Sequence, residues 1–468
     1  MSAPTPRALA AYLTSAISES RAEAELVVLP VPRLDPLALL RAARKGDAWW
    51  LERADEDESL LAIGELRATA LAGTSAALSA HHATRPMRVT AHPDAEASLV
   101  ERLPVTVFGH AFASGASEED PWRHHQDGRA VTPRWTYLAR GDRAALAFAC
   151  EGPSWPGRAA LIASELEMLL AATRAPRASR PGVVIDPWSP GEFLERVESA
   201  RSAIRRGELT KVVCSRRASV TADGDLEPEE VLARLSAPSG LRFLVRRGSS
   251  TLIGATPERL FRKTGLRAQT EALAGTRAQG SSEQALLASA KDQAEHAPVV
   301  EAIVERLERL GARVSREASP ELRRVANVVH LRTAIEAALP EQVEASALLA
   351  ALHPTPAVGG TPRAAAEAFV RANEPPRGWY AGPLGWIDAR GDADVHVMLR
   401  CAVIRGARAW VFAGGGIVAS SDPSAELAET ELKMAPMLRA LGVPVPRDEA
   451  RGHEAHRYDA THRAESGA

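Results

Sequence analysis

Three side chains that could bind a metal ion and an anion are spaced along one predicted helix near the C-terminus. In SDPSAELAETELKMAPMLRALG, Glu426, Glu429 and Lys433 stand at i, i+3 and i+7, which places them on one helical face. Asp422 is typical of an N-cap and Pro423 of the first helical position. The face could bind Mg²⁺, which takes one or two carboxylates together with water and substrate oxygens. A solvated face with an i,i+4 ion pair is the commoner explanation of such spacing.

A run of glycines, FAGGGIV at residues 412–418, ends a predicted strand just before this helix. Glycines allow close backbone approach and can present amide N–H groups to an anion. The run is neither GxGxxG nor a Walker motif, so it supports neither a dinucleotide site nor a P-loop. A tight turn between strand and loop is the alternative. Next to the helix, the run suggests an amide cradle for a carboxylate beside a metal-binding face.

A lysine and a glutamate on separate predicted elements form a candidate acid/base pair. Lys211 stands in the apolar run TKVVC, where a lysine either reaches solvent or is buried with a lowered pKa that suits a general base. Glu258 follows Pro257 in GATPERL and would project from a rigid turn, unless it forms a surface ion pair with Arg259 or Arg262. Their spacing in the sequence does not show whether the two side chains meet.

The composition indicates a globular protein, in which an anionic small substrate would need a locally positive pocket. The 468 residues are 45% hydrophobic and 25% charged, with a net charge of −2 and dispersed basic residues, so nucleic acid is not expected as a partner. The three cysteines are widely spaced and suit a reducing cytoplasm better than a disulfide framework. The N-terminus does not resemble a signal peptide, and no apolar run reaches the ~20 residues of a membrane helix. We therefore expect a cytoplasmic location and no contact with a membrane.

The predicted elements that must position these residues are grouped, which favours an α+β fold over a strictly alternating one. Residues 1–180 contain strand-like runs with connecting helices, and the Pro- and Arg-rich stretch 172–190 reads as a linker. Residues 181–445 form the second region, in which 250–265, 378–388 and 393–406 are strand-like and 281–311 reads as one long helix. The polar tail at 446–468 is expected to be disordered.

Ten separated blocks of the second region resemble, in order, those of chorismate-utilising enzymes. The resemblance covers residues 190–443, and residues 1–180 match it only loosely. The blocks are KVVCSRR, GATPERLF, ALAGTRAQG, SAKDQAEH, VHLRTAI, LHPTPAVGGTP, GWYAGPLGW, MLRCAVI, FAGGGIV and SAELAETELK. Within the family they are most similar to isochorismate synthases, and to the menaquinone-pathway type more than to the siderophore type.

The resemblance implies a fold, a reaction and a cofactor. The implied fold is a single α+β domain of two packed β-sheets with helices on the outside and the active site between the sheets. The implied reaction is the reversible, Mg²⁺-dependent conversion of chorismate to isochorismate, in which water adds at C2 and the C4 hydroxyl leaves. Both compounds are dianionic, so the site needs a local set of cations.

The resemblance also implies roles for individual residues. Lys211 would activate the water, for which its pKa must fall well below the free value of ~10.4, and Glu258 would protonate the leaving hydroxyl. Glu295 and Glu429 would bind Mg²⁺, with Glu426 beside them. The remaining implied residues would hold the substrate or line its pocket: Gly275, His353, Ala357, Tyr380, Arg400, Gly414, Gly416 and Lys433.

Two small residues separate the sister reactions of this family. Enzymes that make aminodeoxychorismate resemble PIKGT, with a nucleophilic lysine, where this chain has Ala274. Relatives that use ammonia or eliminate pyruvate tend to carry Thr where this chain has Ala357. We therefore rank isochorismate synthase first, salicylate synthase second and an anthranilate synthase component third, with a non-catalytic anion-binding module as the alternative of another class. We expect a monomer that needs no glutamine amidotransferase partner.

Overall fold

The structure, a computed structural model, describes most of the chain. The described residues are 4–20, 22–43, 46–71, 75–83, 86–115, 121–152, 155–173, 181–185, 190–237, 240–278, 283–325 and 328–445. Within these ranges no helix has both the length and the apolar character needed to cross a membrane. The predicted disordered tail lies outside the described residues.

The described strands form two sheets that are joined at one long strand, β6 (Gly128–Arg140). The C-terminal part of β6 pairs with β7 (Arg143–Glu151), and its N-terminal part pairs with β5 (Thr106–His110). Each of these neighbours leads into a different sheet. A single strand therefore belongs to both sheets and connects them.

The first sheet is the larger one, and its pairings are antiparallel except that of β1 with β4. In spatial order it contains β4 (Arg88–Ala91), β1 (Ala24–Val31), β7, β6, β3 (Glu58–Ala70), β2 (Ala48–Arg53), β10 (Leu241–Arg247), β11 (Ser250–Thr256), β20 (Cys401–Arg405), β21 (Arg408–Ile417) and β9 (Lys211–Ala222). Two short strands, β8 (Val183–Ile185) and β17 (Gly360–Thr361), pair with the other side of β9.

The second sheet is antiparallel and runs from β5 to the strands that follow α9. In spatial order it contains β5, β18 (Pro383–Ile387), β19 (Ala393–Val397), β12 (Arg259–Thr264), β13 (Arg267–Ala278) and β16 (Val328–Ala338), which pairs with β14 (Arg313–Arg316) and β15 (Glu321–Val325). β2 and β5 come from residues 1–180 and pair with β10 and β18, so the two predicted regions share both sheets.

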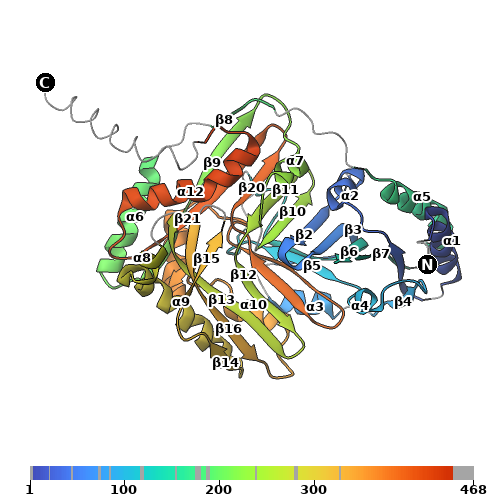
Figure 1. Ribbon diagram of the computed structural model, residues 1–468, viewed down its shortest axis with the longest axis horizontal. Coiled ribbons are helices and arrows are strands. Elements are labelled where there is room, and N and C mark those ends of the chain that lie inside the picture. The colour runs from blue at the N-terminus through green and yellow to red at the C-terminus, as the bar shows by residue number, and fades with distance from the viewer. Residues whose placement is uncertain are drawn as a thin grey trace.

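Helices cover the outside of the sheets (Figure 1). They are α1 (Pro6–Glu19), α2 (Pro36–Ala42), α3 (Ser75–His82), α4 (Ala97–Val100), α5 (Ala159–Leu170), α6 (Pro190–Arg205), α7 (Pro228–Ala233), α8 (Glu283–Leu287), α9 (Ala290–Arg309), α10 (Ala345–Leu352), α11 (Arg363–Asn373) and α12 (Pro423–Leu441), with 3₁₀ turns η1 (Ala54–Glu56) and η2 (Pro156–Arg158). Figure 1 shows α6 and α12 at one end of the molecule and α1 and α5 at the other.

Two large hydrophobic clusters fill the space on either face of the first sheet. Along β1, Leu26 and Val28 belong to the cluster between the sheets, whereas Val27 and Leu29 belong to the cluster under helices α1, α5 and α12. Side chains of a strand alternate between its two faces, so a strand that is apolar at consecutive positions is buried on both. The α+β expectation, with two packed sheets and helices outside, is confirmed.

The structure corrects four of the predicted segments. The helix expected over 281–311 is two helices, because α8 ends at Leu287 and the Ser289 hydroxyl accepts from the Asp292 amide to cap α9. The runs 250–265 and 393–406 are each two strands rather than one. The stretch 172–190, expected to be a linker, contains β8, and its residues 174–180 and 186–189 lie outside the described part.

Candidate active site

Glu258 and Arg400 lie in neighbouring breaks of two paired strands. β11 and β20 pair in the first sheet, and their continuations β12 and β19 pair in the second. The chain therefore crosses from one sheet to the other twice, side by side, at residues 257–258 and 398–400. Two hydrogen bonds join the crossings. The Val397 amide donates to the Glu258 carbonyl (3.0 Å), and the Thr256 hydroxyl donates to the Val397 carbonyl (2.6 Å). A cavity lies at this point, where the sheets part.

The cavity has an empty volume of about 770 Å³, part of it open to solvent. Ten of the thirteen residues predicted for the site line its wall: Lys211, Glu258, Gly275, Ala357, Tyr380, Arg400, Gly414, Gly416, Glu429 and Lys433. They come from β9, β13, β21, α12, the two strand crossings and the loops before β17 and β18. Elements that are far apart in the sequence thus supply one pocket.

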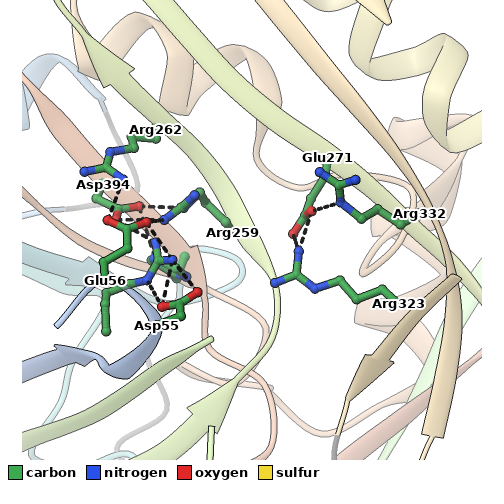
Figure 2. A network of polar contacts seen from close by, with 10 residues as sticks. Asp55, Glu56, Arg259, Arg262, Glu271, Arg323, Arg332 and Asp394 are labelled. Carbon is green, nitrogen blue, oxygen red and sulfur yellow. Dashed lines mark hydrogen bonds and ion pairs between the residues drawn. The ribbon is translucent and has the colours of Figure 1, made fainter. Parts of the chain in front are cut away.

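Glu258 is a carboxyl group that keeps its proton up to neutral pH. Its residue is 8% exposed, and burial raises its pKa to about 7. The carboxylate of Glu271, which is paired with Arg323 and Arg332 (Figure 2), contributes to this rise, while Lys211 and other cations of the cavity oppose it. Such a group can donate a proton at neutral pH.

The residue after Glu258 belongs to a buried ionic network that holds the start of β12. Arg259 contacts Asp394 at 3.1 Å and Glu56 at 2.9 Å (Figure 2). Arg53 contacts the same Asp394 at 3.2 Å. Asp394 is on β19, Arg53 is the last residue of β2, and Glu56 is in the 3₁₀ turn η1 that follows β2. The network therefore ties the turn that carries Glu258 to both sheets.

Arg400 and Ala381 hold unusual backbone conformations on the cavity wall. Their φ angles are 50° and 62°, in the left-handed region that residues other than glycine rarely adopt, and such strain clusters at functional sites. Burial lowers the pKa of Arg400 to about 10, so its guanidinium stays charged at neutral pH. It donates to the Lys433 carbonyl at 3.3 Å.

An aromatic stack that includes Trp122 of the N-terminal region supports the wall beside Tyr380. The rings of Tyr380 and Phe412 stack with centroids 5.5 Å apart, and Trp122 stacks on the other side of Phe412 at 5.1 Å. Burial raises the pKa of Tyr380, so its hydroxyl stays protonated. Gly378 must be glycine, because a Cβ there would lie 2.2 Å from the Trp122 ring.

The glycine run presents peptide groups to the cavity along an open strand edge. β20 pairs with β21 only as far as Val411, so beyond this residue β21 has β9 on one side only. Lys433 Nζ donates to the Gly414 carbonyl at 2.8 Å, which places the Gly414 peptide groups on the side away from β9. The N–H and C=O of one residue point to the same side of an antiparallel strand, and residues two apart point alike. The amides of Gly414 and Gly416 therefore face the open edge.

The acidic face of α12 is only partly on the cavity wall. Asp422 caps the helix as predicted, accepting from the Ala425 amide at 2.9 Å. Glu429 lines the cavity, whereas Glu426 is 5% exposed and lies behind the glycine run. A Cβ on Gly415 would lie 3.0 Å from Glu426 Oε2, so the glycine leaves room for that carboxylate.

The carboxylates of Glu426 and Glu429 suit a hard cation, but the described residues do not form a complete set of metal ligands. No group of three or more His, Cys, Asp or Glu within the described ranges is placed to hold a metal ion. Glu295 belongs to α9, but its side chain lies outside the described part. The buried carboxylate of Glu426 in its glycine cradle and the cavity-facing Glu429 supply the oxygen donors that Mg²⁺ prefers.

Gly275 occupies a bulge of β13, and two residues near it were not predicted for the site. The register of β13 against β16 shifts between Ala274 and Thr276, and Gly275 has a φ of 76°. A Cβ there would lie 3.2 Å from the Cβ of Asp292, which is 7% exposed. His330 lines the cavity and is hydrogen-bonded to the Gly275 backbone; burial lowers its pKa to about 3, so it is neutral. Asp292 lies in the block SAKDQAEH and His330 in the block VHLRTAI, so these blocks could have indicated the two residues.

His353 lies on the far side of its loop from this cavity. It lines a second cavity, with His110 and Arg363, and its Nε2 contacts the Ala381 carbonyl at 3.0 Å. Burial lowers the pKa of His353 to about 3, so the ring is neutral and Nε2 donates this bond. The loop thus separates two cavities, with Ala357 and Val358 on the wall of the first. His353 contacts the back of the pocket wall rather than its interior.

Comparisons with known proteins match between about half and nearly all of the chain. The family profile described as "Chorismate binding enzyme" matches residues 11–442. A "Salicylate biosynthesis isochorismate synthase" of Pseudomonas aeruginosa is 39% identical over 351 residues, 71% of this chain and 73% of that protein. A "Putative isochorismate synthase MenF" of Mycobacterium tuberculosis is 40% identical over 54% of this chain and 74% of its own. The solved structure of MenF, the menaquinone-specific isochorismate synthase of Escherichia coli, has a TM-score of 0.76 and 25% identity over 92% of this chain and 98% of its own.

Proposed function

Because the chain belongs to the family of chorismate-binding enzymes, we propose that it converts chorismate to isochorismate. Relatives that match it are named for this activity. One of them is named for salicylate biosynthesis and another is menaquinone-specific. We assign the isochorismate made here to menaquinone biosynthesis, with a siderophore route as the alternative. The observation that carries the proposal is that Lys211 and Glu258, from separate elements, line one cavity with Arg400 and Lys433.

The reaction needs one proton removed and one supplied. Lys211 takes a proton from the water whose oxygen bonds to C2, while the ring double bond shifts and the bond from C4 to its oxygen breaks. Glu258 gives its proton to the departing hydroxyl, which leaves as water. Lys211 is 3% exposed, at the first position of β9, and Glu258 is in the crossing between β11 and β12. A rigid base and a rigid acid on different elements can act at different carbons of one ring.

Fixed positive groups and amides hold the two carboxylates of the substrate. Arg400 and Lys433 stand on the cavity wall, and the Gly414 and Gly416 amides face the same open edge. A buried guanidinium binds a carboxylate strongly because the surrounding protein does not screen the attraction as water does. These groups compensate the two negative charges within a chain of net charge −2.

Glu429 and Glu426 of α12, with Glu295 of α9, are the residues that would hold Mg²⁺. A bound Mg²⁺ supplies positive charge against a substrate carboxylate and orients it. Two of these carboxylates stand at i and i+3 of one helix, behind and beside the glycine run, so the helix itself sets their separation.

Two alanines on the cavity wall favour water as the nucleophile. Ala274, which is 6% exposed, offers no amine for covalent attack on the substrate, and Ala357 offers no hydroxyl to orient another nucleophile. The reaction therefore proceeds without ammonia, and no glutamine amidotransferase partner is needed.

Incubation of the purified protein with chorismate and Mg²⁺, without ammonium, tests the proposal. Chromatography of the products should show isochorismate in equilibrium with chorismate, and no pyruvate. Salicylate with pyruvate would identify a salicylate synthase, and unchanged chorismate that still binds would identify a non-catalytic binding module. Either result would overturn the proposal.

A further inference from the structure

Arg377 is a fully buried guanidinium that bonds to two separate walls of the active-site cavity. Its side chain is 2% exposed and follows α11 in the chain. It donates to the Val213 carbonyl on β9 at 2.6 Å and to the Val358 carbonyl on the loop 353–359 at 2.8 Å. Both Val213 and Val358 line the cavity, whereas Arg377 itself does not.

Glu374 pairs with Arg377 to form a clamp of two residues, and it holds β9 at a second position. Its carboxylate, 1% exposed, accepts from Arg377 at 2.8 and 3.1 Å. It also accepts from the amide and the hydroxyl of Ser215 at 2.8 and 2.6 Å. Ser215 stands two residues after Val213 on β9. The buried pair is thus satisfied by partners on the strand and the loop, and a buried pair with this geometry fixes positions more than it adds stability.

The two clamped segments carry the residues that the mechanism assigns to the water. Lys211 precedes Val213 by two positions on the same strand, and Ala357 directly precedes Val358. The Val213 amide also donates to the Gly359 carbonyl at 2.9 Å, so the strand and the loop approach each other here. We propose that Arg377, with Glu374, is a positioning residue that sets the distance between the general base Lys211 and the small residue Ala357. The water to be activated lies between them.

This inference rests on the proposed function, because it needs a base that must be aligned with a water and a substrate carbon. A shift of about 1 Å in such alignment can cost about 100-fold in rate. Arg377 does not touch the cavity, so its loss should affect the chemical step more than the binding of chorismate. A purely structural residue would instead lower stability without a specific effect on kcat.

Replacement of the guanidinium by an amine tests the role. In Arg377→Lys the charge opposite Glu374 remains, but one ammonium cannot reproduce the fork that serves two carbonyls. We expect kcat to fall about 100-fold, while KM for chorismate changes by less than about threefold. Thermal unfolding followed by circular dichroism reports the folded fraction.

Arg246→Lys is the matched control. Arg246 is also a buried arginine that pairs with a glutamate, Glu229, and donates to the Leu40 and Ala43 carbonyls, but it does not line the cavity. This variant should lose a similar amount of thermal stability and keep its kcat. If kcat falls equally in both lysine variants, Arg377 is a structural residue and the inference is overturned.

A double variant tests the positioning role of Arg377 if Arg377→Lys does not fold. Arg377→Met with Glu374→Met removes both charges, and apolar replacements of a buried pair are commonly tolerated. It should fold and show the same loss of kcat; a folded double variant with wild-type kcat would sink the proposal. Absence of isochorismate from the wild-type protein would instead refute the proposed function, so the two failures are distinct.

Discussion

The ammonium nitrogen of Lys433 lies 2.6 Å from a carboxylate oxygen of Glu429, one helical turn earlier on α12. The same nitrogen donates to the Gly414 carbonyl, so the pair joins the helix to the open edge of β21. Their side chains are only 15% and 25% exposed, and both face the cavity. The i,i+4 ion pair expected from the commoner explanation does form, but it stands on the wall of the candidate site rather than on a solvated face.

Removal of the Glu429 charge should weaken the binding of Mg²⁺. In Glu429→Gln, the amide keeps the size of the side chain but loses the anionic oxygen that Mg²⁺ prefers. We expect the Mg²⁺ concentration for half-maximal activity to rise at least about tenfold. The comparison is Glu431→Gln on the same helix, whose side chain is 40% exposed and off the cavity wall. An identical Mg²⁺ titration of the two variants would remove Glu429 from the metal site.

The activity should decrease as the pH rises through about 7. Burial raises the pKa of Glu258 to about 7, and a general acid works only while it carries its proton. The protonated fraction is nearly complete at pH 6 and small at pH 8. A profile of kcat against pH checks this, at saturating chorismate and Mg²⁺. A kcat that stays constant between pH 6 and 8.5 would contradict the role of Glu258.

The same carboxyl group should make the folded protein less stable at alkaline pH. Its folded pKa of about 7 lies above the ordinary 4.5, so the folded state loses stability as the pH rises from 4.5 through 7. The difference between these two pKa values corresponds to a loss of about 3 kcal/mol in the free energy of unfolding. Glu258→Gln should therefore unfold at higher urea than the wild type at pH 8 and at similar urea at pH 4.5, without Mg²⁺ or chorismate. Equal urea midpoints of Glu258→Gln and the wild type at pH 8 would contradict this destabilisation by the Glu258 carboxylate.

Lys211→Ala should abolish turnover while chorismate still binds. The variant lacks the base but keeps Arg400 and Lys433, which hold the carboxylates. We expect kcat to fall by at least about 100-fold, the lower range for loss of a general base, with little change in chorismate affinity by calorimetry. Lys263→Ala is the control, because Lys263 is also buried but does not line the cavity. A Lys211→Ala variant with near-normal kcat would exclude this lysine as the base.

Ala357→Thr should reduce isochorismate formation and admit other chemistry. Ala357 lines the cavity, and the adjacent Val358 carbonyl is held by Arg377 at 2.8 Å, so the loop has little freedom to move away from an added hydroxyl. Product chromatography with and without ammonium should show a lower isochorismate yield, with new products when ammonium is present. An unchanged product profile would show that this position does not select the nucleophile.

Local patterns in the sequence determined much of this protein. The Asp422 and Pro423 signals located the start of α12, and apolar residues at consecutive positions of β1 reflect a strand buried on both faces. The spaced blocks identified the family, and most of the residues they marked do line one cavity. These features depend on neighbours within a few residues or on short motifs, which a sequence displays directly.

Only the tertiary structure decided how the site is assembled. The run that contains Arg400 reads as a continuous strand, and the turn predicted at Glu258 gives no sign that the chain changes sheet there. Each run crosses between the sheets at that residue, because its partner strand crosses at the same point. His353 belongs to a motif of the site but faces a second cavity, and Arg377, which no local pattern marked, bonds to two of the cavity walls. Such features follow from the register between distant segments, and no local spacing records that register.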